Sequence, residues 1–237
     1  MFIQILIKFY IMKIRKSFYL EGKLILISET ASLDVDALCG FSELCPKELP
    51  VPGALEIVPE LNKQAKFAKI RVGSKDAHPY IILWEATAEE PQLTPIFGYK
   101  NLDFRWNRHC IVGTKGFEFL PGINPEEYSF IVYKGVEPDK HPYGACYQDL
   151  ADTETTGLIE YLLYNKIKVI IVGGLATSYC LKKTVLQLCA TGKFRVFVNL
   201  AACRDLPTAQ TEVSIEQMEG AGAIMFNGSA DIKEGPK

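Results

Sequence analysis

The sequence predicts an α/β protein with a mostly parallel central sheet and helices on both faces. Short apolar runs rich in β-branched residues alternate with amphipathic helical patterns, and loops containing Pro or Gly separate them. The segment 167–192 shows the pattern best. Its apolar run from Ile167 to Val172 leads through two glycines into a helical pattern that ends at Gly192. Of the 237 residues, 48% are hydrophobic and 23% are charged, which suits a globular protein with a substantial core.

The composition also limits the classes of partner. A net charge of −2 offers no electrostatic reason to expect binding to nucleic acid or to an anionic membrane. No CxxC pair occurs, so neither a disulfide framework nor a zinc ribbon is expected. Free thiols favour a reducing, cytoplasmic location. The seven cysteines are Cys39, Cys45, Cys110, Cys146, Cys180, Cys189 and Cys203.

Residues 1–22 are expected to form an N-terminal extension outside a single domain that spans 23–237. The extension is apolar but is interrupted by basic residues, which makes it too short and too charged to span a bilayer. Its resemblance to a signal peptide is weak, because the charges follow the apolar run.

The first predicted strand lies within 24–36 and ends on two acids, Asp34 and Asp36. A carboxylate at the end of a central strand points into the crevice where open α/β sheets bind ligands. A solvated strand end is the alternative. The following helical pattern, 54–66, is amphipathic, although Pro59 fits poorly inside a helix.

The second predicted strand, 67–73, runs into a loop that contains Asp76 and His78. An Asp-x-His pair can bind one divalent metal through a carboxylate oxygen and an imidazole nitrogen. An insertion at about 80–127 follows and supplies His109 and Trp106. The indole could stack on a flat ligand ring or simply anchor the loop.

The third predicted strand, 129–134, ends on Lys134, which can stabilise an anion or hold a carboxylate in place. The rest of the chain continues the alternation of strand and helix, so we expect about six strands in a Rossmann-like order. The remaining elements are a helix within 157–166 capped by Thr153 or Thr155, strands at 167–172, 194–200 and 223–227, a helix within 208–222, and a tail at 231–237.

Cys180 begins the helix that follows the strand at 167–172. Unpaired backbone N–H groups and the helix dipole favour negative charge at this position, so they stabilise a thiolate. A small apolar core residue is the ordinary alternative for a free cysteine. With Asp36 and Lys134 at neighbouring strand ends, Cys180 completes a plausible nucleophilic site.

Four segments resemble motifs of the isochorismatase-like cysteine hydrolases and, within that family, of the nicotinamidases. They occur along the chain in the same order as in the family. The most specific is GLATSYC at 174–180, which is similar to the family's GLATDYC. The others are KDAHP at 75–79, RWNRHCIVGTKGFEF at 105–119 and the KG of VYKG at 132–135. The resemblance covers roughly residues 30–205.

The resemblance implies that Cys180 is the nucleophile, that Asp36 is the general base and that Lys134 completes the triad. It further implies a cis peptide between Leu175 and Ala176. The backbone N–H groups of Ala176 and Cys180 would then form the oxyanion hole.

The resemblance also implies a divalent metal, zinc or alternatively manganese or iron, held by Asp76, His78 and His109. Phe41 and Trp106 match the aromatics that pack on the pyridine ring. The expected reaction is hydrolysis of nicotinamide to nicotinate and ammonia through a cysteine thioester, as part of NAD salvage.

Several positions depart from the family pattern. The family's usual Gln is Leu38, the Asp of GLATDYC is Ser178, and the residue near 201 that is often Asp is Ala201. The frequent additional histidine after KDAHP is absent, so water or one of three glutamates could supply the fourth metal ligand: Glu85, Glu89 or Glu90. Another small-amide hydrolase of this fold and a non-catalytic ligand-binding relative are the alternative functions. Oligomers are common in the family, so the resemblance allows a homo-oligomer, with the number of subunits open.

Overall fold

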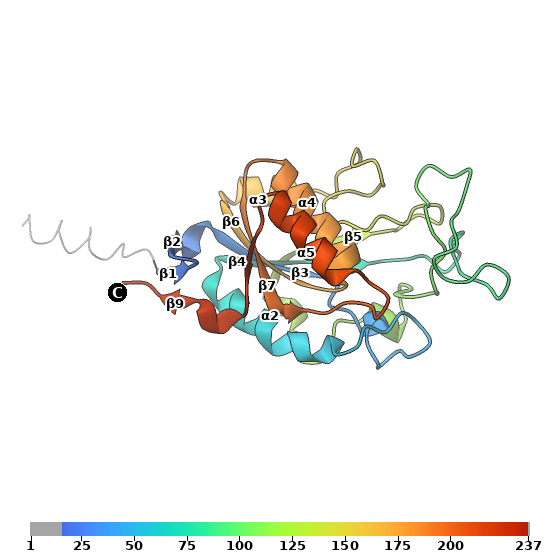
Figure 1. The fold of residues 1–237 in the computed structure, drawn as a ribbon, viewed down its shortest axis with the longest axis horizontal. Helices are drawn as coiled ribbons and strands as arrows, with labels where there is room; N and C mark the ends of the chain where they lie inside the picture. Colours follow the sequence, from blue (N-terminus) through green and yellow to red (C-terminus); the bar gives the residue numbers. More distant parts are fainter. Residues whose placement is uncertain (1–15, 237) are drawn as a thin grey trace, which may run out of the picture.

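Six parallel strands form the central sheet of the computed structural model, which describes residues 16–236 (Figure 1). The chain enters the sheet at its centre, builds one half outward, crosses back and builds the other half. This is the expected Rossmann-like order, and its switch point lies between the two central strands, β3 and β6. In sheet order the strands are β5 (Tyr128–Lys134), β4 (Ile70–Asp76), β3 (Thr30–Val35), β6 (Val169–Gly174), β7 (Arg195–Cys203) and β8 (Ile224–Phe226).

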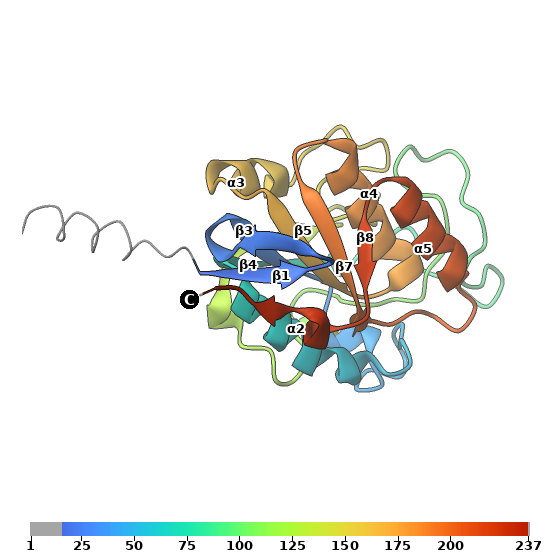
Figure 2. The ribbon, with the colours of Figure 1, turned by 60° about the vertical axis from the view of Figure 1, so that its left-hand side comes forward.

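Helices cover both faces of this sheet, as expected (Figure 2). One face packs against α3 (Leu158–Tyr164), α4 (Lys182–Ala190) and α5 (Thr211–Gly220) through a core of aliphatic side chains. The other face packs against α2 (Val58–Gln64). No helix among residues 16–236 is long and apolar enough to cross a membrane.

Helix α2 is shorter than the expected helix at 54–66, because a 3-10 turn, Ala54–Ile57, replaces its beginning. Pro59 lies in the first turn of α2, where a backbone N–H has no partner within the helix. The proline therefore ends up at the one part of a helix that tolerates it.

A second, antiparallel sheet contains β1 (Ser17–Leu20), β2 (Lys23–Leu26) and β9 (Lys233–Glu234). Residues 1–15 of the expected N-terminal extension lie outside the described residues. Within the remainder, Phe18 and Leu20 are buried in a cluster with side chains of the central sheet. The sequence predicted that the strand at 223–227 is the last one. This prediction is wrong, because β9 follows it. Two residues that pair only through their backbone leave no pattern in the sequence.

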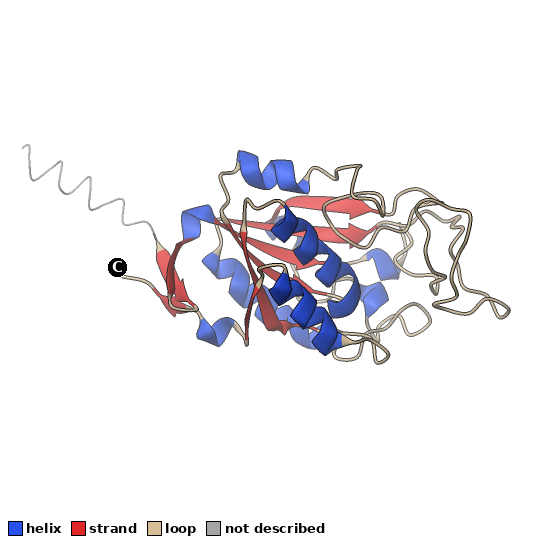
Figure 3. Ribbon diagram, turned by 45° about the horizontal axis from the view of Figure 1, so that its top comes forward, coloured by secondary structure: helices blue, strands red, loops and turns tan. Residues whose placement is uncertain are grey.

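The insertion at about 80–127 consists mainly of loops beyond the carboxyl ends of the strands (Figure 3). Trp84 and Trp106 are buried inside it, and their backbones are joined by a hydrogen bond from Trp106 N to Trp84 O of 3.0 Å. The insertion and the small sheet lie at opposite ends of the molecule (Figure 1).

Candidate active site

The polar residues predicted at the strand ends meet at one edge of the sheet. Asp76 ends β4 and pairs in register with Lys134, the last residue of β5. Asp36 directly follows β3, and Cys180 follows β6 after a short loop. Because β5, β4, β3 and β6 are neighbours and parallel, their carboxyl ends bring these four side chains together.

Lys134 links the other members of this group. Its fully buried ammonium lies 3.0 Å from Asp36 Oδ2 and also pairs with Asp76 Oδ1. The same nitrogen lies 3.7 Å from Cys180 Sγ. Burial alone would lower the pKa of Lys134, but the charges of Asp36 and Asp76 raise it well above its usual value. Lys134 therefore stays positively charged beside the thiol.

Asp36 is held by Ser74 as well as by Lys134. The Ser74 hydroxyl donates a hydrogen bond of 2.6 Å to Asp36 Oδ1. Burial raises the pKa of Asp36 to about 6, although the Lys134 ammonium opposes the shift. The carboxylate is thus mostly ionised at neutral pH and remains basic enough to accept a proton.

Asp34, the other acid at the end of this strand, has a structural role instead of a place in the candidate active site. Its Oδ2 accepts hydrogen bonds from Arg71 Nε at 2.8 Å and from the Tyr128 hydroxyl at 2.7 Å. Asp34 therefore belongs to a buried ion pair inside the sheet, whereas Asp36 belongs to the group around Lys134.

Cys180 lies in a π-helical turn, Thr177–Leu181, that leads into α4. Burial raises the pKa of Cys180 well above its usual value, and Lys134 only partly opposes the increase. The expected thiolate at a helix start is therefore wrong for the free protein. The desolvation of a buried sulfur, with Asp36 and Asp76 nearby, outweighs the favourable charges. The peptide bond between Leu175 and Ala176 is cis, as the resemblance implies.

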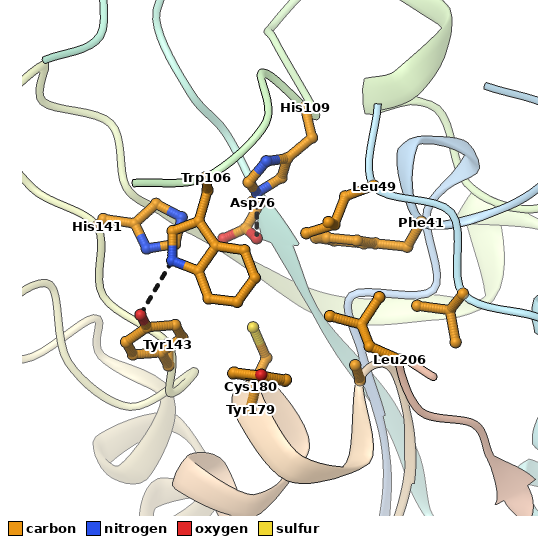
Figure 4. Close-up of a pocket in the computed structure, with 12 residues that line it drawn as sticks. Phe41, Leu49, Asp76, Trp106, His109, His141, Tyr143, Tyr179, Cys180 and Leu206 are labelled. Carbon is orange, nitrogen blue, oxygen red and sulfur yellow. Dashed lines mark hydrogen bonds and ion pairs between the residues drawn. The ribbon is translucent and has the colours of Figure 1, made fainter. Parts of the chain in front are cut away.

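A small pocket opens above Cys180, with about 320 Å³ of empty space that includes solvent at its mouth (Figure 4). Phe41 and Trp106, the predicted ring-packing residues, both line it. Trp106 Nε1 donates a hydrogen bond of 3.1 Å to the Tyr143 hydroxyl, which donates one of 2.8 Å to Asp103. Tyr143 also lines the pocket, and no motif in the sequence pointed to it. Fixed aromatic walls of this kind suit a small flat ligand.

Of the three predicted metal ligands, Asp76 and His109 line this pocket, and His78 is fully buried beside them. His78 Nδ1 lies 3.1 Å from the Gly135 carbonyl, and His78 Nε2 lies 3.7 Å from Asp76 Oδ1. His109 Nδ1 lies 2.6 Å from the Asn107 carbonyl, and His109 Nε2 lies 3.8 Å from Asp76 Oδ2. A carbonyl partner keeps the proton on Nδ1 and directs the lone pair of Nε2 toward the Asp76 carboxylate. This donor set fits a divalent metal.

His141 comes from the loop after β5 and joins the same wall. Its ring centroid lies 5.3 Å from that of His78 and 5.7 Å from that of His109. The sequence assigns no role to His141, and the one signal that points to it is scarcity, since the chain has only three histidines.

The glutamates considered as a fourth ligand are engaged elsewhere or exposed. Glu85 pairs with Arg108 at 3.0 Å, and Glu90 pairs with Arg105 at 2.5 Å. Glu89 is exposed to solvent.

Comparison with known proteins places this geometry in context. The model of the isochorismatase domain family matches residues 41–228. The nicotinamidase of Escherichia coli is 29% identical over 123 residues, which are 51% of this chain and 57% of that protein. The nicotinamidase of Schizosaccharomyces pombe is 28% identical over 56% of this chain and 65% of its own length. The chain thus spans less than two thirds of these two relatives, whereas it spans 86% of the Acinetobacter baylyi nicotinamidase, with 28% identity over 78% of this chain.

Two solved structures have the same fold at similar identity. The nicotinamidase/pyrazinamidase of Acinetobacter baumanii aligns with a TM-score of 0.78 and 27% identity, covering 86% of this chain and 98% of the other. The pyrazinamidase of Pyrococcus horikoshii in complex with zinc aligns with a TM-score of 0.66 and 28% identity, covering 84% and 99%.

Proposed function

This chain belongs to the isochorismatase domain family, and on that premise we propose that it hydrolyses nicotinamide to nicotinate and ammonia. The observation that carries the proposal is the buried Lys134, which joins Asp36 and Cys180 directly below an aromatic pocket. The relatives named as nicotinamidases support this substrate. The reaction returns the pyridine ring for NAD salvage.

In the first half of the reaction, Asp36 removes the proton from the Cys180 thiol, and the sulfur attacks the carboxamide carbon. The backbone N–H groups of Ala176 and Cys180 hold the oxygen as it gains negative charge. The protonated Asp36 then donates its proton to the departing nitrogen. Ammonia leaves, and a thioester joins Cys180 to the nicotinoyl group.

In the second half, a water molecule enters beside the thioester and gives a proton to Asp36 as its oxygen attacks the carbonyl carbon. The carbon–sulfur bond breaks, the proton on Asp36 returns to Cys180, and the product loses its acid proton to water as it leaves as nicotinate. Lys134 keeps its charge throughout, so it stabilises whichever of Asp36 and Cys180 is negative.

Asp76, His78 and His109 would hold the divalent metal, for which we favour zinc because its ligands in proteins are imidazole nitrogens and carboxylate oxygens. When bound, the metal would hold the pyridine nitrogen and withdraw electron density from the ring. Phe41 and Trp106 would pack on the faces of the ring and orient the carboxamide toward Cys180.

The test is ammonia release from nicotinamide, with zinc or manganese added, by the parent protein and by Cys180→Ala. We expect release by the parent and a loss of roughly four orders of magnitude or more in the variant, since the nucleophile is gone. Cys189→Ala, which changes a half-buried cysteine in α4, is the matched control and keeps full activity.

Equal release by the parent and Cys180→Ala would refute the assigned nucleophile. Release from other small carboxamides but not from nicotinamide would indicate a different amidase of this fold. Binding of nicotinamide without any ammonia release would indicate a non-catalytic relative.

A further inference from the structure

We propose that His141 is a direct ligand of the metal, so that His78, His109 and His141 bind it together with Asp76. This inference deepens the metal site of the proposed function and rests on that part of it. His141 would be the fourth protein ligand, in place of the water or glutamate that the sequence suggests.

The first support is distance. One ring nitrogen from each of the three histidines can be chosen so that all three lie within 4.8 Å of one another. With zinc–nitrogen bonds of 2.0–2.1 Å, two neighbouring nitrogen ligands are about 3 Å apart, and a five-coordinate zinc that takes these four ligands keeps a fifth position for the pyridine nitrogen. The rings therefore need only a small inward movement to share one ion. Figure 4 shows His109, His141 and Asp76 gathered on the same wall of the pocket.

The second support is the unusual state of the His141 ring. Its side chain is nearly inaccessible, at 4% exposure, and neither ring nitrogen has a hydrogen-bond partner among the described residues. His78 and His109 each have an Nδ1 partner and an Nε2 near Asp76. Buried polar groups without partners are rare in folded proteins, and a bound ion is one of the few explanations for those that occur.

The third support is the way the backbone fixes the position of His141. Its N–H donates a hydrogen bond of 3.0 Å to the Asn101 carbonyl in the insertion. The next residue, Pro142, has restricted backbone freedom, and its carbonyl accepts a hydrogen bond of 3.4 Å from Lys134 Nζ. The loop is thus tied on both sides of His141, which holds its ring against the site.

Neither the tryptophan nor the glutamates near the histidines compete with His141 as the fourth metal ligand. Trp84 packs against the rings of His78, His109 and His141 at centroid distances of 4.6, 5.2 and 4.5 Å, and an indole does not bind metals. Glu85 and Glu90 are paired with arginines at the rim. Of the three clustered histidines, His141 is the one whose two ring nitrogens both lack a hydrogen-bond partner among the described residues.

The composition of the set has a consequence for the metal. Three imidazoles and one carboxylate suit zinc, whereas manganese and magnesium prefer oxygen ligands. Loss of His141 should therefore weaken zinc binding more than manganese binding. Loss of the oxygen ligand, Asp76, should instead weaken manganese binding more than zinc binding.

The experiment compares zinc, cobalt and manganese affinities of the purified parent, His141→Ala and Asp139→Ala by competition with a chromophoric chelator. Asp139 is an exposed residue of the same loop and controls for disturbance of the loop. We expect zinc affinity of His141→Ala to fall by more than the roughly 10- to 100-fold that loss of an outer-shell partner costs. The visible spectrum of bound cobalt should also change, and Asp139→Ala should match the parent.

A folded His141→Ala with unchanged zinc affinity and an unchanged cobalt spectrum would overturn the proposal and leave His141 as a wall of the ligand pocket. His141→Gln, which keeps much of the side-chain volume, serves if the alanine variant does not fold. Failure of the parent to bind any of the three metals would overturn it too. None of these readouts uses ammonia release, so the amidase activity is judged separately.

Discussion

At the scale of single residues, burial controls the acid–base chemistry of the site. Cys180 is only 7% exposed, and burial raises its pKa well above the usual value, so the free protein keeps a thiol rather than a thiolate. Asp36, whose pKa burial raises to about 6, is ionised at neutral pH and can take that proton. The two shifts divide the proposed work between an acid–base residue and a nucleophile that is activated only when it reacts.

We predict that kcat/KM falls as the pH decreases through about 6, because protonated Asp36 cannot accept the thiol proton. Ser74→Ala removes a hydrogen bond that favours the ionised carboxylate, so the pKa of Asp36 should rise further. The acidic limb of the pH profile should then move to higher pH by about 0.5–1 unit.

The control for this prediction is Ser32→Ala. Ser32 is another buried serine of the sheet, but its hydroxyl contacts Gln64 instead of Asp36. An acidic limb that stays in place in Ser74→Ala, or that moves equally in both variants, would show that Asp36 does not set it.

At the scale of elements, the parallel pairing of neighbouring strands fixes the positions of the side chains in the site. The ends of β4 and β5 are in register, so the loops that follow them lie side by side, and Gly135 after β5 supports His78 after β4. Gly135 has φ +67°, and a Cβ on it would lie 2.5 Å from His78 Cε1. A larger side chain at position 135 is therefore unfavourable for two reasons: the positive φ strains its backbone, and its Cβ would clash with the His78 ring.

We predict that Gly135→Ala weakens zinc binding by about 10- to 100-fold, because it displaces the carbonyl that orients the His78 ring. Gly113→Ala is the matched control, since Gly113 also has a positive φ, +84°, but no atom lies within 4 Å of its Cβ position. Chelator competition measures both. Equal zinc affinities in the two variants would mean that the contact with His78 is unimportant.

At the scale of the whole molecule, the candidate site and the hydrophobic core of the small sheet lie at opposite ends of the central sheet. The candidate site lies beyond the carboxyl ends of the strands, and the small sheet of β1, β2 and β9 packs at the opposite end (Figure 1). Phe18 of β1 is fully buried there with Ile171 and Phe197 of the central sheet. Residues 17–20 thus contribute to the core although they fall within the expected extension.

We predict that Phe18→Ala lowers the free energy of unfolding by about 3–5 kcal/mol, because it leaves a cavity in that core. Denaturant unfolding measures the loss, and Phe18→Leu, which keeps most of the volume, should lose much less. Activity per folded molecule should persist in both. A loss below about 1 kcal/mol in Phe18→Ala would place β1 outside the cooperative core.

The sequence by itself determined the features that depend on local pattern. Apolar runs and helical periodicity predicted the parallel sheet, its order and its two helical layers, since each segment carries its own hydrophobic pattern. Short motifs indicated Asp36, Asp76, Lys134 and Cys180, because residues at the ends of neighbouring parallel strands must meet.

Only the tertiary structure decided the features that depend on burial and on contacts between distant segments. Asp34 and Asp36 look alike in sequence, but Arg71 pairs with the first and Lys134 with the second. His141 stands alone in its loop and reaches the other histidines only when β5 pairs with β4. The protonation of Cys180 is likewise not a local property, because desolvation and the charges around a sulfur are properties of the folded chain.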